Sequence, residues 1–362
     1  MKAGWEYKHI GDLCEVIAGQ SPEGKFYNSE GNGLPFYQGK KDFGEKFIEA
    51  PTSWTTQTTK VAREGDILMS VRAPVGPVNF AAEEICIGRG LAAIRSKGEL
   101  DREFLYYQLL HLQPKIAGKE GAVFASINKS EISALPIVFA PLPEQQRIVG
   151  ILDEAFEGIA IAKVNAEKNL QNARALFESH LNGIDAAKVP LGDLVKITTG
   201  KLDSNAAVEG GVYPFFTCSR GIYAIDTFAF DCEAILLAGN NAVGDFNVKH
   251  YNGKFNAYQR TYVITVNEHQ RVLYRFLYYQ MLKSLKKFKE QSVGAGTKFL
   301  KLGMIKDMEI ALPSLEEQEQ IVSTTDSLLE ETKNLESIYQ QKLAALDALK
   351  KSLLDQAFRG EL

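Results

Sequence analysis

The chain has 362 residues, of which 45% are hydrophobic and 24% are charged, and its formal net charge is −4. These values are ordinary for a soluble globular protein with apolar content for two or three domains. No apolar run approaches the roughly 18 residues of a membrane span, and the N-terminus lacks an apolar signal core, so the sequence predicts a cytoplasmic protein.

Residues 1–142 are predicted to form a mixed lobe dominated by short strands. Their short apolar or alternating runs are broken by glycine and proline. The expected strands cover 66–71, 85–94 and 132–139, and one amphipathic helix covers about 101–112.

A long helix is predicted to follow, from Pro143 to about His180. Its apolar residues recur in steps of three or four from Ile148 to Phe177, which places one stripe along one side of a helix. Proline is tolerated in the first turn, and the Asn182-Gly183 pair is a usual C-terminal stop. A helix of this length, roughly 55 Å at about 1.5 Å per residue, is too long for one small lobe.

The second half of the sequence repeats this plan. Gly11-Asp12-Leu13 recurs as Gly192-Asp193-Leu194, and a Phe-Leu-Tyr-Tyr-Gln run begins at both Phe104 and Phe276. A second long helix is expected from Leu315 to about Phe358. It is opened by a capping box in which Ser314 and Glu317 satisfy each other's amides. The parts are therefore predicted at 1–142, 143–185, 186–314 and 315–362.

The repeat predicts an α+β protein in which two lobes are joined by two long helices. Because a lone helix with one apolar face is marginal in water, we expect the two stripes to pack against each other as an antiparallel pair, with an approximate two-fold axis. The alternative is that each helix folds back onto its own lobe.

The charge is distributed unevenly among these parts. Residues 1–142 carry a net charge of −1 and residues 188–314 carry +5, while the two helix segments together carry −8. The acid is concentrated on the helices, so the lobes remain compatible with a polyanionic partner, although solvated helix faces explain the same pattern.

The common catalytic and metal-binding motifs are absent from the sequence. It contains no glycine-rich nucleotide loop, no H-E-x-x-H and no G-x-S-x-G. The four cysteines form no C-x-x-C pair and the five histidines are isolated. We therefore predict no catalytic residue, cofactor or metal ion on this chain.

The lobes carry loops rich in Gly, Arg, Lys and Asn at matched places. Arginine recognises guanine by two hydrogen bonds, asparagine recognises adenine in the same way, and lysine holds phosphates. The candidate DNA-binding residues are Lys40, Lys41, Arg72, Arg89, Ser126, Lys129, Arg220, Asn240, Asn241, Arg260 and Lys298.

Some of these residues have a structural alternative. Arg89 and Arg260 are expected at the starts of similar strands, so they also suit a framework role in which each pairs with a carboxylate. Arg72 and Asn240-Asn241 lie on predicted turns, which favours base contact. The tyrosine pairs 106–107 and 278–279 lie on amphipathic helices, which favours burial in the core over base stacking.

Several short runs, duplicated and in order, resemble the specificity subunits of type I restriction-modification systems over essentially the whole chain. They are Leu-Pro-Glu-Gln-Gln-Arg-Ile-Val from Leu142 with its echo at Leu315, Ile-Gly-Arg-Gly-Leu-Ala-Ala-Ile from Ile87, the two Phe-Leu-Tyr-Tyr-Gln runs, and Leu-Asp-Gln-Ala-Phe-Arg-Gly from Leu354. The second lobe departs from the pattern, with Ala-Tyr-Gln-Arg-Thr from Ala257.

The resemblance implies two target-recognition domains, each reading half of a split, asymmetric site in double-stranded DNA, and an antiparallel coiled coil that sets the unread spacer. It implies a non-catalytic subunit that recruits two methyltransferase subunits, which bind S-adenosylmethionine, and restriction-translocase subunits, which use ATP and Mg. The expected partner-facing residues are Glu144, Gln145, Glu316 and Glu317. A coiled-coil adaptor presenting two protein- or glycan-binding lobes is the alternative.

Overall fold

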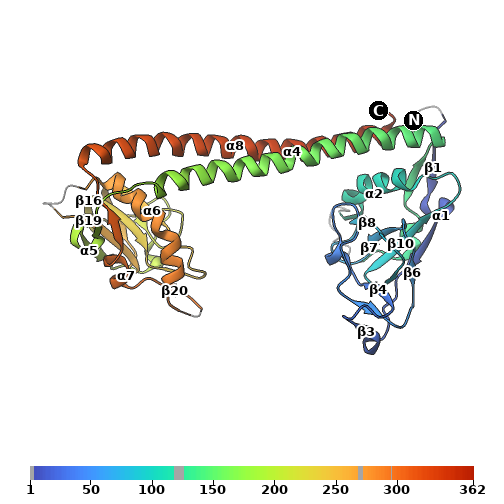
Figure 1. Ribbon diagram of the computed structural model, residues 1–362, viewed down its shortest axis with the longest axis horizontal. Helices are drawn as coiled ribbons and strands as arrows, with labels where there is room; N and C mark the ends of the chain where they lie inside the picture. The colour runs from blue at the N-terminus through green and yellow to red at the C-terminus, as the bar shows by residue number, and fades with distance from the viewer. Residues whose placement is uncertain (1–3, 118–125, 268–271, 295) are drawn as a thin grey trace. The chain divides into compact units, whose positions relative to one another are not determined.

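The computed structural model describes residues 4–117, 126–267, 272–294 and 296–362. The chain folds as two compact units, one formed by Met1–Ala166 with Gln341–Leu362 and the other by Glu167–Gln340 (Figure 1). Among the described helices, none combines the length and the apolar character that crossing a membrane requires.

In its described residues, the first unit contains sheets of two, four and five strands and three helices besides its segments of the long helices. Its strands are β1 (Glu6–His9), β2 (Cys14–Ala18), β3 (Tyr27–Asn28), β4 (Leu34–Tyr37), β5 (Trp54–Thr55), β6 (Val61–Ala62), β7 (Ile67–Ser70), β8 (Val78–Phe80), β9 (Ile85–Ile87), β10 (Leu91–Ser96) and β11 (Pro136–Phe139). Its helices are α1 (Ile10–Leu13), α2 (Arg102–Ala117) and α3 (Lys129–Ser133), with 3-10 turns η1 (Gly24–Phe26) and η2 (Lys40–Asp42). The sheets have the orders β2-β10-β7-β8 and β3-β5-β4-β9-β6, and β1 pairs with β11.

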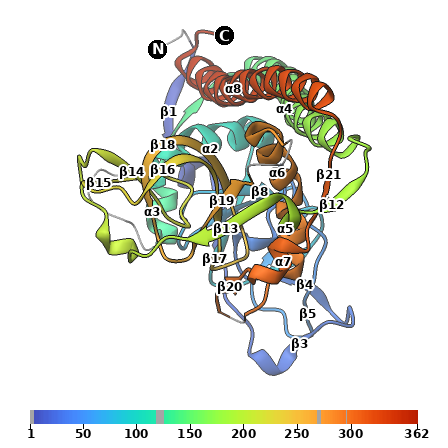
Figure 2. The same cartoon turned by 90° about the vertical axis from the view of Figure 1, so that its left-hand side faces the viewer.

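The second unit repeats this arrangement with longer strands (Figure 2). Its strands are β12 (Lys188–Pro190), β13 (Val195–Thr199), β14 (Tyr213–Phe216), β15 (Tyr223–Ile225), β16 (Phe230–Ala238), β17 (Asn240–Asn241), β18 (Val248–Ala257), β19 (Thr261–Val266), β20 (Lys298–Phe299) and β21 (Glu309–Ala311). Its short helices are α5 (Leu191–Leu194), α6 (Tyr274–Gln291) and α7 (Leu302–Lys306), with the 3-10 turn η3 (Ser204–Ala206). One sheet has the order β13-β19-β16-β18-β14-β15.

The predicted duplication is confirmed strand by strand. The neighbours β2-β10-β7-β8 of the first unit correspond to β13-β19-β16-β18 of the second, and the β1–β11 pair corresponds to β12–β21. Each unit also has one parallel pair at an equivalent place, β4 with β9 and β14 with β18. The α+β prediction is therefore confirmed within each unit.

Two sequence predictions in the first lobe were wrong in detail. The run expected as one strand over 85–94 is two strands, β9 and β10, separated by a turn at Gly88-Arg89-Gly90. The run expected as a strand from Ile132 starts as helix α3, and β11 begins only at Pro136. Asn128 caps α3 by accepting a hydrogen bond from the Glu131 amide at 3.0 Å, so local capping starts a helix in an apolar run.

The long helices α4 (Leu142–Asn182) and α8 (Leu315–Arg359) agree closely with the sequence prediction. The Ser314 amide donates to the Glu317 carboxylate at 2.8 Å, as the capping box requires. Each helix is continuous across the boundary between the units, so each unit contains a segment of both.

The two helices run antiparallel in both units. In the first unit Arg147 donates to the carbonyl of Leu362 at 2.6 Å, while Lys163 further along α4 reaches back to Asp347 at 2.5 Å. In the second unit Arg174 pairs with Glu336 at 2.6 Å. Packing on the lobes is also present, since Ile148 and Leu152 of α4 belong to the first core and Ile321 of α8 packs on the second.

The apolar stripe predicted for α8 was partly wrong. Leu335, Ile338 and Leu349 are 40%, 56% and 47% exposed. Thr332, which belongs to the predicted stripe, is buried, and so is Thr325, which does not; the Thr325 hydroxyl donates to the carbonyl of Ile321 at 2.6 Å. A threonine whose hydroxyl bonds to its own helix is able to occupy an inner position, and apolar spacing alone does not reveal this.

Candidate nucleic-acid interface

In the first lobe, three candidate residues are brought together at the carboxyl end of β7 and the start of β10. The Val71 amide donates to the Gly90 carbonyl at 3.0 Å, and the Ile127 amide donates to the Val71 carbonyl at 3.0 Å. Arg72 forms an antiparallel bridge with Ser126. The exposed side chains of Arg72, Arg89 and Ser126 therefore belong to one loop cluster.

The lysines predicted after β4 lie beside this cluster. The Gly88 amide donates to the Tyr37 carbonyl at 2.8 Å, and a Cβ at Gly90 would lie 2.2 Å from the carbonyl oxygen of Gln38. Only glycine permits that approach, which brings Lys40 and Lys41 of η2 near the turn. Lys129 is exposed in the first turn of α3.

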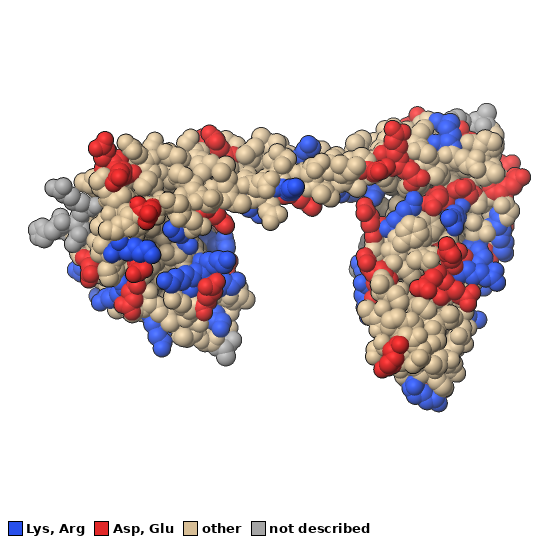
Figure 3. All heavy atoms as spheres, in the orientation of Figure 1, with Lys and Arg blue, Asp and Glu red and all other residues tan. Residues whose placement is uncertain are grey.

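The second lobe has the same frame with different side chains. The Gly239 amide donates to the Arg260 carbonyl at 2.9 Å, and the Leu300 amide donates to the Gly239 carbonyl at 2.9 Å. Asn240 pairs with Phe299 and Asn241 pairs with Lys298 in the β17–β20 ladder. Figure 3 shows Lys and Arg side chains gathered across the visible face of this lobe, among fewer acidic ones.

These matching hydrogen bonds place Asn240 at the position of Arg72 and correct one expected match. The Leu91 amide donates to the Gly88 carbonyl, and the Thr261 amide donates to the Tyr258 carbonyl in the same way. Counting from these pairs, Arg260 corresponds to Gly90, and the counterpart of Arg89 is Gln259. The sequence match of Arg89 with Arg260 was therefore wrong by one residue.

The framework alternative for the two arginines would require each to pair with a carboxylate. Within the described residues, neither Arg89 nor Arg260 has such an ion pair, and both are exposed. The guanidinium of Arg260 instead lies over the ring of Phe299, 5.1 Å from its centroid. A cation held over a ring keeps its hydrogen-bonding edge available to a ligand.

The two candidate asparagines have different surroundings. The Asn241 side-chain oxygen accepts hydrogen bonds from the amides of Val243 and Asp245, at 2.9 and 3.0 Å. Both lone pairs of that oxygen are therefore used. A two-point contact with adenine needs the side-chain oxygen and nitrogen together, so Asn240 is better suited to it than Asn241. No side-chain hydrogen bond of Asn240 is found in the part of the chain that the structure describes.

Sequence reasoning predicted Arg220 but missed three charged residues of the second cluster, which are Asp245, Lys249 and Lys289. Arg220 donates to Asp245 at 2.6 Å, and Lys289 of α6 lies beside Gly244. Lys249 is half-buried, and its ammonium donates to the Ser219 carbonyl at 2.7 Å and to Asn247. Burial lowers the pKa of Lys249. No motif marks these residues, because Asp245 lies in a loop, Lys249 on β18 and Lys289 near the end of α6.

Three of the four tyrosines of these pairs are core residues, as predicted, while Tyr278 is half-buried against the second core. Tyr106 and Tyr107 are 4% and 3% exposed, and Tyr279 is fully buried. The Tyr107 hydroxyl donates to Asp153 of α4, and the Tyr279 hydroxyl donates to Asp326 of α8. These bonds attach each long helix to its lobe.

Gln145, expected to face a partner, is buried, and that prediction was wrong. Its side chain accepts from the Asp101 amide at 2.8 Å and donates to the carbonyls of Glu99 and Ala140 at 3.0 and 2.7 Å. The first turn of α4 is therefore fastened to the lobe. Gln318 of α8 repeats the bond by accepting from the Leu273 amide at 3.0 Å.

The acidic residues beside these glutamines differ in exposure. Glu144 is half-buried and bonded to Arg147 at 2.8 and 3.0 Å. Glu317 is exposed, but its carboxylate is used in the helix cap, and the Ser314 hydrogen bond lowers its pKa. Glu316 is exposed.

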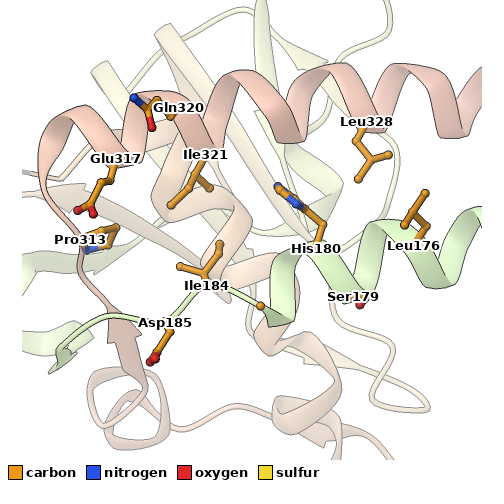
Figure 4. Close-up of a pocket in the computed structure, with 11 residues that line it drawn as sticks. Leu176, Ser179, His180, Ile184, Asp185, Pro313, Glu317, Gln320, Ile321 and Leu328 are labelled. Atoms are coloured by element: carbon orange, nitrogen blue, oxygen red, sulfur yellow. The ribbon is translucent and has the colours of Figure 1, made fainter.

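The second unit has a groove of about 570 Å³ between the end of α4 and the start of α8. Figure 4 shows Ile321 of α8 and Ile184 facing each other across it, with Leu176 and Leu328 further along. His180 also lines the groove, and its buried Nε2 atom has no hydrogen-bond partner among the described residues.

Two equivalent frames that carry unlike side chains define a class of protein with two related but different loop surfaces. Residues 2–172 and 184–344 each match the family described as "Type I restriction modification DNA specificity domain". The chain belongs to this family.

Three known proteins extend the comparison. Over 179 residues the chain is 42% identical to the type I restriction enzyme EcoDI specificity subunit of Escherichia coli, covering 49% of this chain and 39% of that protein. It therefore spans about two fifths of that relative's length. The type I restriction enzyme MjaIX specificity subunit of Methanocaldococcus jannaschii is 22% identical, over 99% of this chain and 93% of that protein.

The third protein is a solved structure described as "Structural basis underlying complex assembly and conformational transition of the type I R-M system". It covers 100% of this chain and 99% of its own, with a TM-score of 0.80 and 19% identity. At 19% identity, this structural similarity is evidence for the fold alone.

Proposed function

We propose that this chain is the DNA-reading, non-catalytic subunit of a type I restriction-modification complex. In this proposal the recognition domains, residues 1–142 and 186–314, each read one half of a bipartite, asymmetric DNA site. The observation that carries the proposal is the pair of equivalent loop clusters with different side chains. Arg72 and Asn240 share one backbone position, yet arginine suits guanine and asparagine suits adenine.

The contact residues are assigned by the same reasoning. Arg72, Arg89, Asn240 and Arg260 are proposed to contact base edges, since they lie at the turns of the two clusters. Asn241 is proposed to order its loop. Apart from Arg220, which pairs with Asp245, the remaining candidates are proposed to hold the sugar-phosphate chain, and they are Lys40, Lys41, Ser126, Lys129 and Lys298.

The helix pair is proposed to set the length of unread DNA between the half-sites. Both α4 and α8 continue without interruption through the two units. A repeated, continuous helix is a suitable spacer, because a helix lengthens by a fixed 1.5 Å per residue and resists compression.

A selected-sequence experiment tests the reading of DNA. The complex with its methyltransferase subunits is incubated with a random duplex library, and bound or methylated molecules are sequenced. We expect two short sequence blocks separated by roughly one helical turn. The logarithm of the binding constant should fall linearly with the logarithm of the salt concentration, with a slope of about −0.9 for each phosphate contacted. One continuous block contradicts the bipartite assignment. A binding constant independent of salt favours the alternative of a protein- or glycan-binding adaptor.

The helix pair is also proposed as the place where methyltransferase subunits bind. Each unit leaves apolar side chains of the pair uncovered, Ile161, Val164 and Leu349 in one and Leu176, Leu335 and Ile338 in the other. Such side chains at helical spacing suit a partner that adds helices to the pair. Glu144, Glu316 and Glu317 are proposed to lie at the polar rim of this surface.

We expect the double change Leu335→Glu, Ile338→Glu to weaken assembly with the methyltransferase by tenfold or more. Burying each side chain contributes roughly 1.5–3 kcal/mol, and a charge in its place opposes burial. Native mass spectrometry measures the assembled fraction. Val212→Glu is the control, because Val212 is 75% exposed on the second lobe. Equal assembly of both variants would remove these side chains from the interface.

A further inference from the structure

The Arg220–Asp245 ion pair is the most exposed charge pair of the second loop cluster. The Nη2 atom of Arg220 lies 2.6 Å from Oδ2 of Asp245, and the two side chains are 76% and 50% exposed. Arg220 follows β14 at the position that Lys41 occupies after β4, as the pairings of Phe216 with Ala257 and Tyr37 with Ile87 establish. The pair therefore lies on the surface proposed to contact DNA.

Asp245 is held on an ordered loop. Its amide donates to the side-chain oxygen of Asn241 at 3.0 Å, and Gly244 before it has a φ of +75°, a conformation that favours glycine. The Arg220 hydrogen bond, with the nearby charge of Lys289, holds the pKa of Asp245 below its ordinary value. The carboxylate is thus ionised at neutral pH, and its pairing is lost only as the pH falls through that lowered pKa.

The surroundings of this carboxylate are basic. A Cβ at Gly244 would lie 3.3 Å from Cγ of Lys289 and 3.5 Å from Cγ of Lys298. Lys249 also lies close to Arg220, whose charge contributes to lowering the lysine pKa. An acidic side chain in such a cluster lowers the attraction for phosphate, so its presence calls for an explanation in terms of recognition.

Among the described residues of the first lobe, Lys41 at the matching position has no ion pair with a carboxylate from another loop. The Ser70 amide donates to the Pro77 carbonyl and the Ala238 amide to the Asn247 carbonyl, so the turn that carries Asp245 is two residues longer than its counterpart, residues 71–76, which contains no acidic residue. Lys41 is 3.7 Å from Asp42, its own neighbour in the chain. An ion pair at this position with a carboxylate from a separate loop is thus found in the second lobe.

A free guanidinium and a paired one select different ligands. A free arginine carries a full positive charge and gains affinity from any phosphate, whatever the sequence. An arginine neutralised by a carboxylate gains little from phosphate, which the carboxylate repels. Asp245 accepts from Nη2 only, so other N–H groups of the five remain for the two acceptors on the edge of guanine.

We propose that Asp245 is a specificity-determining positioning residue, which neutralises and orients Arg220 so that this arginine reads a base edge instead of contacting phosphate. The inference rests on the proposed function of the second lobe as a DNA reader. It adds that the lobe obtains selectivity by suppressing a phosphate contact.

The test compares Asp245→Asn with Glu309→Gln in the full chain bound to its methyltransferase subunit. Glu309 lies in the same lobe, pairs with Lys188 at 3.7 Å and is 58% exposed. Its replacement by glutamine alters the net charge by the same amount as Asp245→Asn. Binding to the selected duplex and to a scrambled duplex of equal length is measured between 50 and 200 mM salt. Circular dichroism confirms that both variants are folded.

We expect Asp245→Asn to bind the scrambled duplex more tightly, with a salt slope steeper by about 0.9, which is roughly a threefold greater loss of affinity across that salt range. The ratio of selected to scrambled affinity falls by a similar factor. In an Arg220→Ala background the same change leaves the ratio of selected to scrambled affinity unaltered, because Asp245 determines specificity through that arginine, and the lost negative charge acts equally on both duplexes.

Three results overturn the inference. They are an equal change for both duplexes, a response matching that of Glu309→Gln, and a change in the ratio of selected to scrambled affinity that persists without Arg220. The unsubstituted complex shows whether the proposed function itself fails, separately from the role of Asp245. If that complex does not prefer the selected duplex, the DNA-reading role fails whatever Asp245 does.

Discussion

Gln145→Ala is expected to destabilise the first unit by about 3 kcal/mol, because three backbone groups lose the hydrogen bonds of one buried side chain at once and each bond contributes roughly 1 kcal/mol. The affected groups are the amide of Asp101 and the carbonyls of Glu99 and Ala140. Alanine cannot replace these bonds, and water has no access to a side chain that is 0% exposed.

The chain offers a selective measurement of this effect. Both tryptophans, Trp5 and Trp54, belong to the first unit, so denaturant unfolding followed by tryptophan fluorescence reports on that unit. Gln146→Ala is the control, since Gln146 is an exposed neighbour and its replacement brings the same gain in helix propensity. Coincident unfolding midpoints for the two variants would show that Gln145 does not fasten α4 to the lobe.

Arg72→Ala and Asn240→Ala are expected to relax recognition in different halves of the DNA site. Each removes one two-point contact, which is worth about 1–3 kcal/mol of discrimination, or roughly 5- to 150-fold, at one base pair. Arg72→Ala should leave the half read by the second lobe unchanged, and Asn240→Ala the half read by the first. Sequencing of methylated adenines in a host carrying each variant measures both halves together.

Two further variants sharpen this comparison. Arg63→Ala is the control for Arg72, since Arg63 is exposed and precedes β7, whereas Arg72 follows it. Asn241→Ala should weaken the second half-site as a whole, because its side chain orders the loop through the amides of Val243 and Asp245. Methylation motifs unchanged by both Arg72→Ala and Asn240→Ala would exclude these residues from base reading.

Features fixed by local patterns were predicted correctly from the sequence. The bounds of α4 and α8, the Ser314–Glu317 cap and the burial of Tyr106 and Tyr107 follow from periodicity and capping, which act within a few residues. The duplication was also visible, because matched runs recur in order. By contrast, the Ile132 prediction failed where the cap at Asn128 outweighed strand propensity.

Contacts between distant residues were beyond sequence reasoning. Gln145 and Gln318 look like surface residues of acidic helix openings, yet each side chain accepts from a lobe amide 44 or 45 residues away. The match of Arg89 with Arg260 failed for the same reason, since a one-residue register difference is set by hydrogen bonding between strands and not by residue type.

By itself, the sequence determined the repeated plan of lobe and long helix and the polar residue types of the loops, because periodicity, caps and recurring motifs are properties of neighbouring residues. Only the tertiary structure decided which of those loops form one cluster, that Asn241 serves its own loop, and that Asp245 accompanies Arg220. The physical reason is that hydrogen bonds and ion pairs act over about 3 Å, and residues far apart in the chain come within that distance only when the strands have paired.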